Sequence, residues 1–116
     1  MMARPTPVVF PGAGNALAAM TLAAVLVYTA PAAYADMATA EKNACLNCHA
    51  VDKKMVGPAF KDIASKYKAR SDAETYLSQK ITQGGAGVWG AIPMPAMQQI
   101  PPAELKAMVV WILNQP

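Results

Sequence analysis

The sequence predicts an all-α domain of four to five short helices. Several stretches repeat apolar residues at spacings of three and four, which is the period of a helix with one buried face. In the predicted domain, no stretch alternates apolar and polar residues as a half-buried strand does, and no internal repeat is present. Glycine and proline pairs separate the helical stretches. These observations favour short helices joined by turns.

Residues 1–35 have the features of a secretory signal peptide. Arg4 and the amino terminus carry positive charge, Ala16 to Val27 is apolar, and Ala33-Tyr34-Ala35 forms a small-x-small cleavage site. We therefore assign residues 36–116 to one mature domain, which would lie outside the cytoplasmic membrane. An uncleaved membrane anchor is the alternative, although the apolar segment is short for a membrane span.

The domain contains the pattern Cys45-Leu46-Asn47-Cys48-His49, in which an imidazole directly follows two thiols three residues apart. This C-x-x-C-H pattern is typical of covalent haem attachment. Residues at i and i+3 share one face of a helical turn, so Cys45 and Cys48 can both reach the vinyl groups along one porphyrin edge. His49 then lies under the ring, where a ring nitrogen can bind the iron. We predict one covalently attached haem c.

A zinc site and a redox dithiol are the alternatives for these cysteines. The chain has two Cys and one His, so a four-ligand zinc site would need a carboxylate as well. A thioredoxin-like dithiol normally belongs to a βαβ pattern, and the sequence shows none. Covalent haem attachment is therefore the favoured interpretation.

The size and charge of the chain agree with a small domain that packs on a cofactor. A domain of about 80 residues buries little apolar surface, and a haem supplies an apolar disc on which short helices can pack. The net charge is +3, but the lysines are scattered among acids and form no basic run. We interpret them as a solvated surface, with a lysine patch for an acidic redox partner as the alternative. No motif supports nucleic-acid binding.

The first two helices flank the attachment motif. Residues 37–45 are rich in Ala, Glu and Lys, and we expect one helix that delivers Cys45 to the haem edge. Val51 to Gly57 is a loop, and Pro58 can start the second helix at a position where its missing N–H is not needed. The apolar face of the second helix comprises Phe60, Ile63, Ala64 and Tyr67.

Two further helices complete the domain. Ser71 and Glu74 form a capping box for the third helix, which runs to about Gln83 and ends at Gly84-Gly85. Pro101-Pro102 starts the last helix, with Glu104 placed in its first turn to suit the helix dipole. The apolar faces comprise Ala73, Tyr76, Leu77 and Ile81 in the third helix, and Leu105, Met108, Val109 and Ile112 in the last.

Gly84 to Pro102 is the one long irregular segment of the domain, and a connection this long in a small domain is usually functional. Since His49 is the only histidine, a second imidazole cannot bind the opposite side of the iron. Met94 stands between Pro93 and Pro95, which keep the backbone extended and stiff, so the thioether is held with little loss of entropy. We predict Met94 as the second axial ligand, with Met97 as the alternative.

An iron bound by both His49 and Met94 has no open position for oxygen, peroxide or nitrite. Transfer of single electrons remains, and a thioether ligand raises the reduction potential. We therefore expect an electron carrier and not an enzyme. The alternatives are a haem enzyme or gas sensor with an open sixth position, and a membrane-tethered redox module that retains the leader.

Four segments carry a family likeness: Cys45 to Ala50, Lys54 to Phe60, Gly87 to Gly90, and Ile92 to Pro95. Together they resemble the small bacterial class I cytochromes c of the c-551/c-552 type, over residues 38–114. The resemblance implies an all-α fold around one haem, in which the first and last helices cross. It also implies a periplasmic location. It also implies electron supply from a bc1-type complex or another donor, and delivery to nitrite reductase or a terminal oxidase. We expect a monomer.

The resemblance also implies roles for residues beyond the motif. The Pro58 carbonyl would accept the Nδ1–H of His49, a bond that orients a ligating imidazole. The Trp89 indole and Lys80 would lie near a haem propionate. Many relatives have an Asn or Gln soon after the axial methionine that donates a hydrogen bond to it, and Gln98 and Gln99 are the candidates here.

Overall fold

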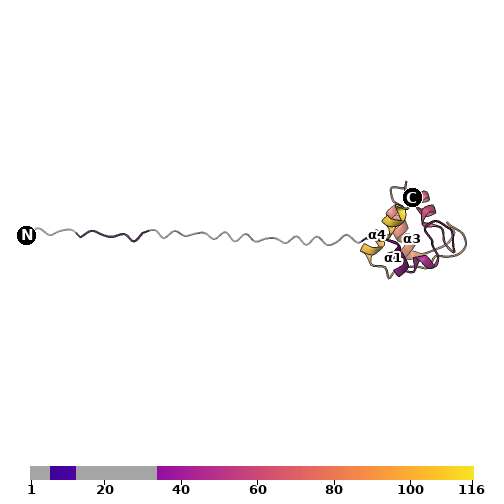
Figure 1. The fold of residues 1–116 in the computed structure, drawn as a ribbon, viewed down its shortest axis with the longest axis horizontal. Helices are drawn as coiled ribbons and strands as arrows, with labels where there is room; N and C mark the ends of the chain where they lie inside the picture. Colours follow the sequence, from indigo (N-terminus) through magenta and orange to yellow (C-terminus); the bar gives the residue numbers. More distant parts are fainter. Residues whose placement is uncertain (1–5, 13–33) are drawn as a thin grey trace, which may run out of the picture. The chain divides into compact units, whose positions relative to one another are not determined.

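The computed structural model describes residues 6–12 and 34–116. Most of the predicted signal peptide, including its apolar segment, lies outside the described residues. Residues 6–12 have no regular secondary structure. Residues 34–116 form four α-helices and one 3-10 helix in the order α1 Met37–Lys42, η1 Cys45–Asn47, α2 Phe60–Tyr67, α3 Ala73–Gln83 and α4 Pro102–Leu113 (Figure 1). The described part has no strand beyond one isolated bridge, which confirms the all-α class.

Helix α1 is shorter than the sequence predicted. It begins after Asp36, whose Oδ1 accepts a bond of 2.9 Å from the Thr39 backbone N–H, and it ends at Lys42. Ala44 then takes a left-handed conformation with φ of 60°, which interrupts the helix. The prediction of one helix ending at Cys45 was therefore wrong, because Cys45 starts a separate 3-10 turn.

Helix α2 has the predicted buried face but not the predicted start. Pro58 does not open the helix, because Ala59 is extended, with ψ of 145°, and acts as the N-cap. The four residues buried in α2 are the predicted ones: Phe60, Ile63, Ala64 and Tyr67.

Helix α3 ends at Gln83 as predicted, but the predicted capping box does not form. The N-cap is Asp72, and no side chain bonds to the free N–H groups at this end. Arg70 instead engages the Asp72 carboxylate through Nε at 2.9 Å and Nη2 at 2.8 Å. The Asp72 carboxylate is therefore engaged by Arg70 and does not cap the helix.

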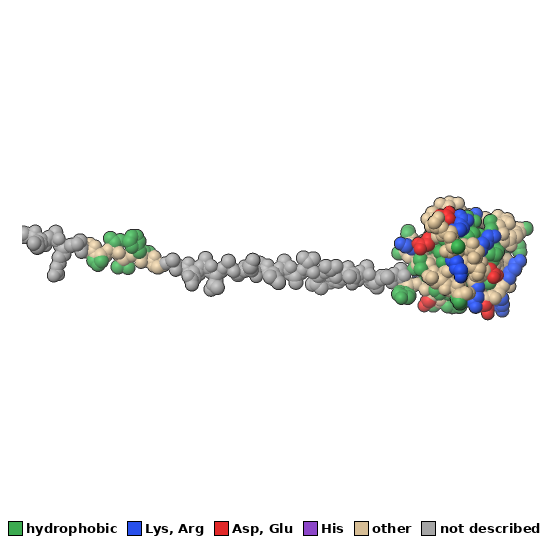
Figure 2. Space-filling model, turned by 90° about the horizontal axis from the view of Figure 1, so that it is seen from above, with side chains coloured by type: hydrophobic (Ala, Val, Ile, Leu, Met, Phe, Trp, Pro, Cys, Tyr) green, Lys and Arg blue, Asp and Glu red, His purple; other side chains and the backbone are tan. Residues whose placement is uncertain are grey.

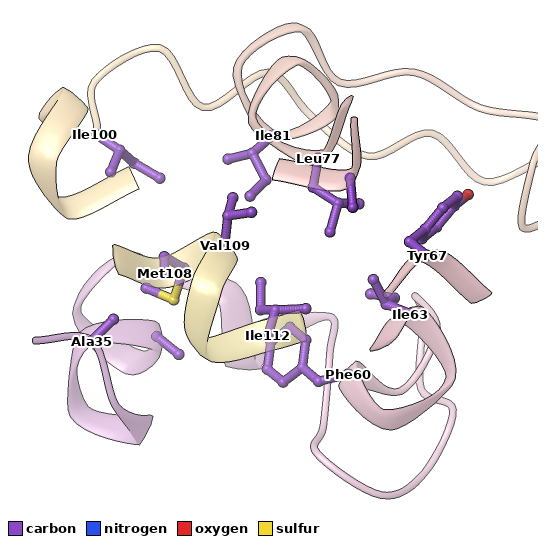
Figure 3. Packing of buried hydrophobic residues seen from close by; sticks show 12 residues of the cluster. Ala35, Phe60, Ile63, Tyr67, Leu77, Ile81, Ile100, Met108, Val109 and Ile112 are labelled. Carbon is purple, nitrogen blue, oxygen red and sulfur yellow. The ribbon is translucent and has the colours of Figure 1, made fainter. Parts of the chain in front are cut away.

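Helix α4 is the centre of the core and packs on α2 and α3 (Figure 3). Its buried residues Met108, Val109 and Ile112 belong to the same cluster as Phe60 of α2 and Leu77 of α3. The polar start of α4 contacts the end of α1. Glu104 accepts hydrogen bonds from Asn43 Nδ2 at 2.7 Å and from Lys42 Nζ at 3.2 Å. These bonds hold the pKa of the Glu104 carboxyl below its ordinary value.

No helix in residues 6–12 or 34–116 has the length and apolar character needed to cross a membrane. The face of the domain in Figure 2 carries acidic and basic side chains interspersed with apolar ones.

Candidate haem site

A single cavity of about 450 Å³ collects all seven predicted site residues. Side chains from α2, α3 and α4, the attachment motif and the long loop contribute to its wall. The predicted residues among them are Cys45, Cys48, His49, Pro58, Lys80, Trp89 and Met94. Both candidate sulfur ligands, Met94 and Met97, line the cavity.

The attachment motif forms one helical turn, as its spacing required. The backbone N–H groups of Cys48 and His49 both donate to the Cys45 carbonyl, at 3.2 Å and 2.9 Å. The two thiols form no disulfide and both border the cavity. Burial raises the pKa of the Cys45 thiol, whereas a redox dithiol depends on a lowered one. The motif therefore fits covalent attachment better than thiol exchange.

The His49 imidazole is held in one orientation and is only 8% exposed. Its Nδ1 lies 2.7 Å from the Pro58 carbonyl oxygen, which confirms the predicted contact. Because a carbonyl can only accept, Nδ1 carries the proton and donates it. In the neutral imidazole this tautomer leaves Nε2 with a free lone pair, which is what a metal ligand needs.

Two neighbours of this imidazole were missed at the sequence level. A Cβ atom added to Gly57 would lie 2.5 Å from His49 Cε1, 2.9 Å from Nδ1 and 3.0 Å from Nε2. The Phe60 ring stacks on the imidazole with centroids 5.3 Å apart and planes 18° apart. The sequence signalled Gly57 only as part of a turn and Phe60 only as core, although both contact the ligand.

The long loop brings Met94 to the cavity through backbone bonds. Gly85 and Met94 exchange two bonds, of 3.0 Å and 2.9 Å, and the Met97 N–H donates to the Ile81 carbonyl at 2.9 Å. Gly84 has φ of 67°, and a Cβ there would collide with the Met94 carbonyl oxygen. The loop is therefore fastened to the end of α3 at Met94 and again three residues later, at Met97.

One of the two candidate glutamines contacts Met97 and not Met94. Gln99 Nε2 donates to Met97 Sδ at 3.4 Å. The hydrogen bonds within the described residues include none to Met94 Sδ. Whether Gln98 or Gln99 tunes an iron-bound sulfur therefore stays a prediction.

Trp89 and Lys80 line the same cavity, and each takes part in a contact between a lysine and an aromatic ring. Lys66 Nζ lies 4.8 Å from the Trp89 ring centroid, and Lys80 Nζ lies 5.4 Å from that of Tyr76. Both arrangements are cation–π contacts. The expected contact of Trp89 and Lys80 with a propionate stays a prediction. The position of Lys66 beside Trp89 was not predicted.

The donor set fits a haem. Two unpaired thiols, a preoriented imidazole and a thioether surround one largely apolar space. Within residues 6–12 and 34–116, no three His, Cys, Asp or Glu side chains gather where they could hold one metal ion, so the zinc alternative lacks its ligands. These features define a c-type haem protein with an all-α fold.

Comparison with known proteins gives the family. The cytochrome c family model matches residues 35–116. Cytochrome c-552 of Nitrosomonas europaea is 50% identical over 94 residues, which are 81% of this chain and 91% of that protein. Cytochrome c-551 of Allochromatium vinosum is 46% identical over 85 residues, 73% of this chain and 90% of that protein. The crystal structure of the wild-type Nitrosomonas europaea protein has 51% identity and a TM-score of 0.68, and covers 70% of this chain and 100% of that one.

The chain belongs to the cytochrome c family, within the c-551/c-552 type. It is a monohaem electron carrier and not an enzyme, and its cofactor is a covalent haem c at the Cys45, Cys48 and His49 motif. When attached, the haem supplies a one-electron couple. The predicted class, fold and cofactor are thereby confirmed.

Proposed function

We propose that this chain carries single electrons in the periplasm, from a donor such as a bc1-type complex to an acceptor such as nitrite reductase or a terminal oxidase. Residues 1–35 would be a signal peptide and residues 36–116 a monomeric haem domain. The observation that carries the proposal is that His49 and Met94, distant in sequence, line one cavity together with both thiols.

In this proposal His49 Nε2 and Met94 Sδ would hold the haem iron. The Nδ1–H bond to Pro58 orients the ring so that Nε2 is the nitrogen available to the metal, and the bridge to Gly85 fixes the backbone of Met94. Two fixed ligands leave no position for a substrate. Because both ligands are held by the protein and do not depend on solvent, little rearrangement accompanies electron transfer. The thioether favours the reduced state and raises the potential.

Five exposed apolar side chains border the cavity and form what we call the apolar rim. They are Met55, Val56, Val88, Trp89 and Ile92, with exposures from 38% to 67%. An exposed apolar patch marks an interaction site. We place the docking of redox partners on this rim, where a partner's cofactor comes nearest the haem.

The charges beside the apolar rim indicate the character of the partner. Lys54 and Lys80 are the charged side chains among the residues that line the cavity, and no Asp or Glu lines it. A partner with an apolar patch bordered by carboxylates would match this surface. The mixed charge of the face in Figure 2 is instead typical of solvated surface.

Substitution of the two methionines tests the ligand assignment. Wild-type holoprotein should be low-spin in both oxidation states, with a weak far-red band in the ferric form from iron–sulfur bonding. Met94→Ala should abolish that band and allow carbon monoxide to bind, because the sixth position opens. Met97→Ala is the matched control and should leave the spectrum nearly unchanged. The reverse result assigns the ligand to Met97, and a high-spin wild type favours a haem enzyme or gas sensor.

Mass analysis of the mature protein tests the leader. A mature amino terminus at Asp36 agrees with cleavage after Ala35. A retained leader would favour the membrane-tethered module.

A further inference from the structure

Trp111 does not line the cavity, but it contacts Phe60, which does. It lies on α4, far along the sequence from the attachment motif. Its ring meets Phe60 edge to face, with centroids 5.3 Å apart and planes 72° apart. Such aromatic pairs prefer this geometry and contribute beyond the area they bury. The contact therefore restrains where the Phe60 ring can lie.

Phe60 passes this restraint to His49. Phe60 is 2% exposed and stacks on the imidazole at 5.3 Å. It belongs to the core cluster at the junction of α2 and α4 (Figure 3), and it also lines the haem cavity. Close-packed interiors transmit displacements because a side chain has no free space to absorb them. Trp111, Phe60 and His49 thus form a chain of three rings in contact, the first pair edge to face and the second pair stacked.

Among the contacts of the imidazole, this chain of rings is the apolar one that restrains the plane of the ring. The Pro58 carbonyl fixes Nδ1, and the Gly57 backbone leaves room for the ring without gripping it. A single hydrogen bond allows the ring to tilt about the bond axis, whereas a stacked ring resists that tilt.

We propose that Trp111 is a positioning residue for His49, acting through Phe60 to hold the plane of the imidazole. The inference rests on the proposed role of His49 as an iron ligand. Trp111 would then join the residues that orient His49. The packing of α4 on α2 would affect the orientation of the imidazole.

The test measures hydrogen exchange of the His49 Nδ1–H by NMR in the reduced holoprotein. Trp111→Leu should speed exchange about two- to tenfold, the factor that corresponds to loss of an edge-to-face pair. Trp111→Phe, which keeps an aromatic edge, should restore nearly wild-type exchange. Val109→Ala is the matched control, because Val109 is fully buried on the same helix but does not line the cavity.

Unchanged exchange in Trp111→Leu, or equal acceleration in Val109→Ala, would overturn the inference, because the effect would then be absent or due to general loosening. If Trp111→Leu yields no holoprotein, Phe60→Leu must show the faster exchange, and unchanged exchange there has the same negative meaning. The low-spin spectrum is recorded in parallel. If wild type lacks it, the proposed function fails; if only the exchange result is negative, this inference alone fails.

Discussion

The two sides of the haem cavity are built in different ways. On the histidine side, the ligand is a buried side chain surrounded by a carbonyl, a stacked ring and a close glycine. On the methionine side, the candidate ligand stands in an irregular loop, half-buried, and its backbone is what the protein fastens. The first side controls the orientation of a ring, and the second controls the path of a chain.

One glycine on each side shows this difference. Gly57 leaves space for the His49 side chain, while Gly84 leaves space for the backbone of residues 94–96. Gly84 also has φ of 67° and ψ of −154°, a backbone conformation that residues other than glycine seldom adopt. The histidine side can therefore yield by moving a ring, but the methionine side can yield only by moving the loop.

The largest expected effect follows Gly84→Ala. Backbone strain and the collision with the Met94 carbonyl together should lower the free energy of unfolding by about 2–4 kcal/mol. The far-red iron–sulfur band should weaken, while the His49 Nδ1–H signal stays in place. Guanidinium denaturation and the ferric spectrum of the holoprotein measure both.

Gly85→Ala is the control for that change. Gly85 also has a positive φ, of 126°, but an added Cβ meets no atom within 4 Å. It should lose about 1–2 kcal/mol from strain alone and keep the band. Equal loss of the band in both variants would show that the collision at Gly84 is unimportant.

A smaller effect, on the opposite side, is expected for Gly57→Ala. The added methyl must displace the imidazole, which we expect to cost about 1–3 kcal/mol as overpacking. The ring signals of His49 should shift and its Nδ1–H should exchange faster, while the iron–sulfur band persists. NMR of the reduced protein is the measurement. If the band disappears and the His49 signals do not move, the division between the two sides is wrong.

The smallest effect is expected at Glu104, whose contacts with α1 lie on neither side of the haem cavity. Asn43 and Lys42 lower the pKa of Glu104 in the folded protein, so its ionised form stabilises the fold at pH above its ordinary value of 4.5. This contribution is lost as the pH falls through the lower, folded-state pKa. Glu104→Gln should therefore be less stable than wild type near neutral pH, and the difference should close in acid.

Thermal unfolding as a function of pH measures this difference. Glu41→Gln, an exposed change on α1, the helix that carries Lys42, should show no comparable trend. A Glu104→Gln difference that stays constant from neutral to strongly acid pH would contradict the pKa argument. The haem spectrum should not change in either variant.

Most of the fold followed from residue spacing. The buried face of α2 was predicted residue by residue, because a period of three to four with polar residues between allows one solution. The helix ends were less predictable. Nothing in an alanine signals a left-handed conformation, so the break at Ala44 was missed. The capping box predicted from Ser71 and Glu74 did not form, and the N-cap is Asp72.

The site was predictable where chemistry restricts the residue type. A thiol, imidazole or thioether in a fixed pattern has few other uses, and all seven predicted residues line the cavity. Gly57, Phe60 and Trp111 were not foreseen as site residues, since a glycine or an aromatic has many structural uses. Their relation to His49 depends on tertiary packing, which brings α4 against α2.

The cavity of about 450 Å³ has a consequence for how the protein matures. Its wall includes Phe60, Met108 and Ile112, which are also core residues, so the interior stays incomplete until the porphyrin fills it. A domain this small has little other burial with which to remain compact. We expect the chain without haem to be loosely collapsed, with both thiols accessible, and to become rigid only when a haem fills the cavity.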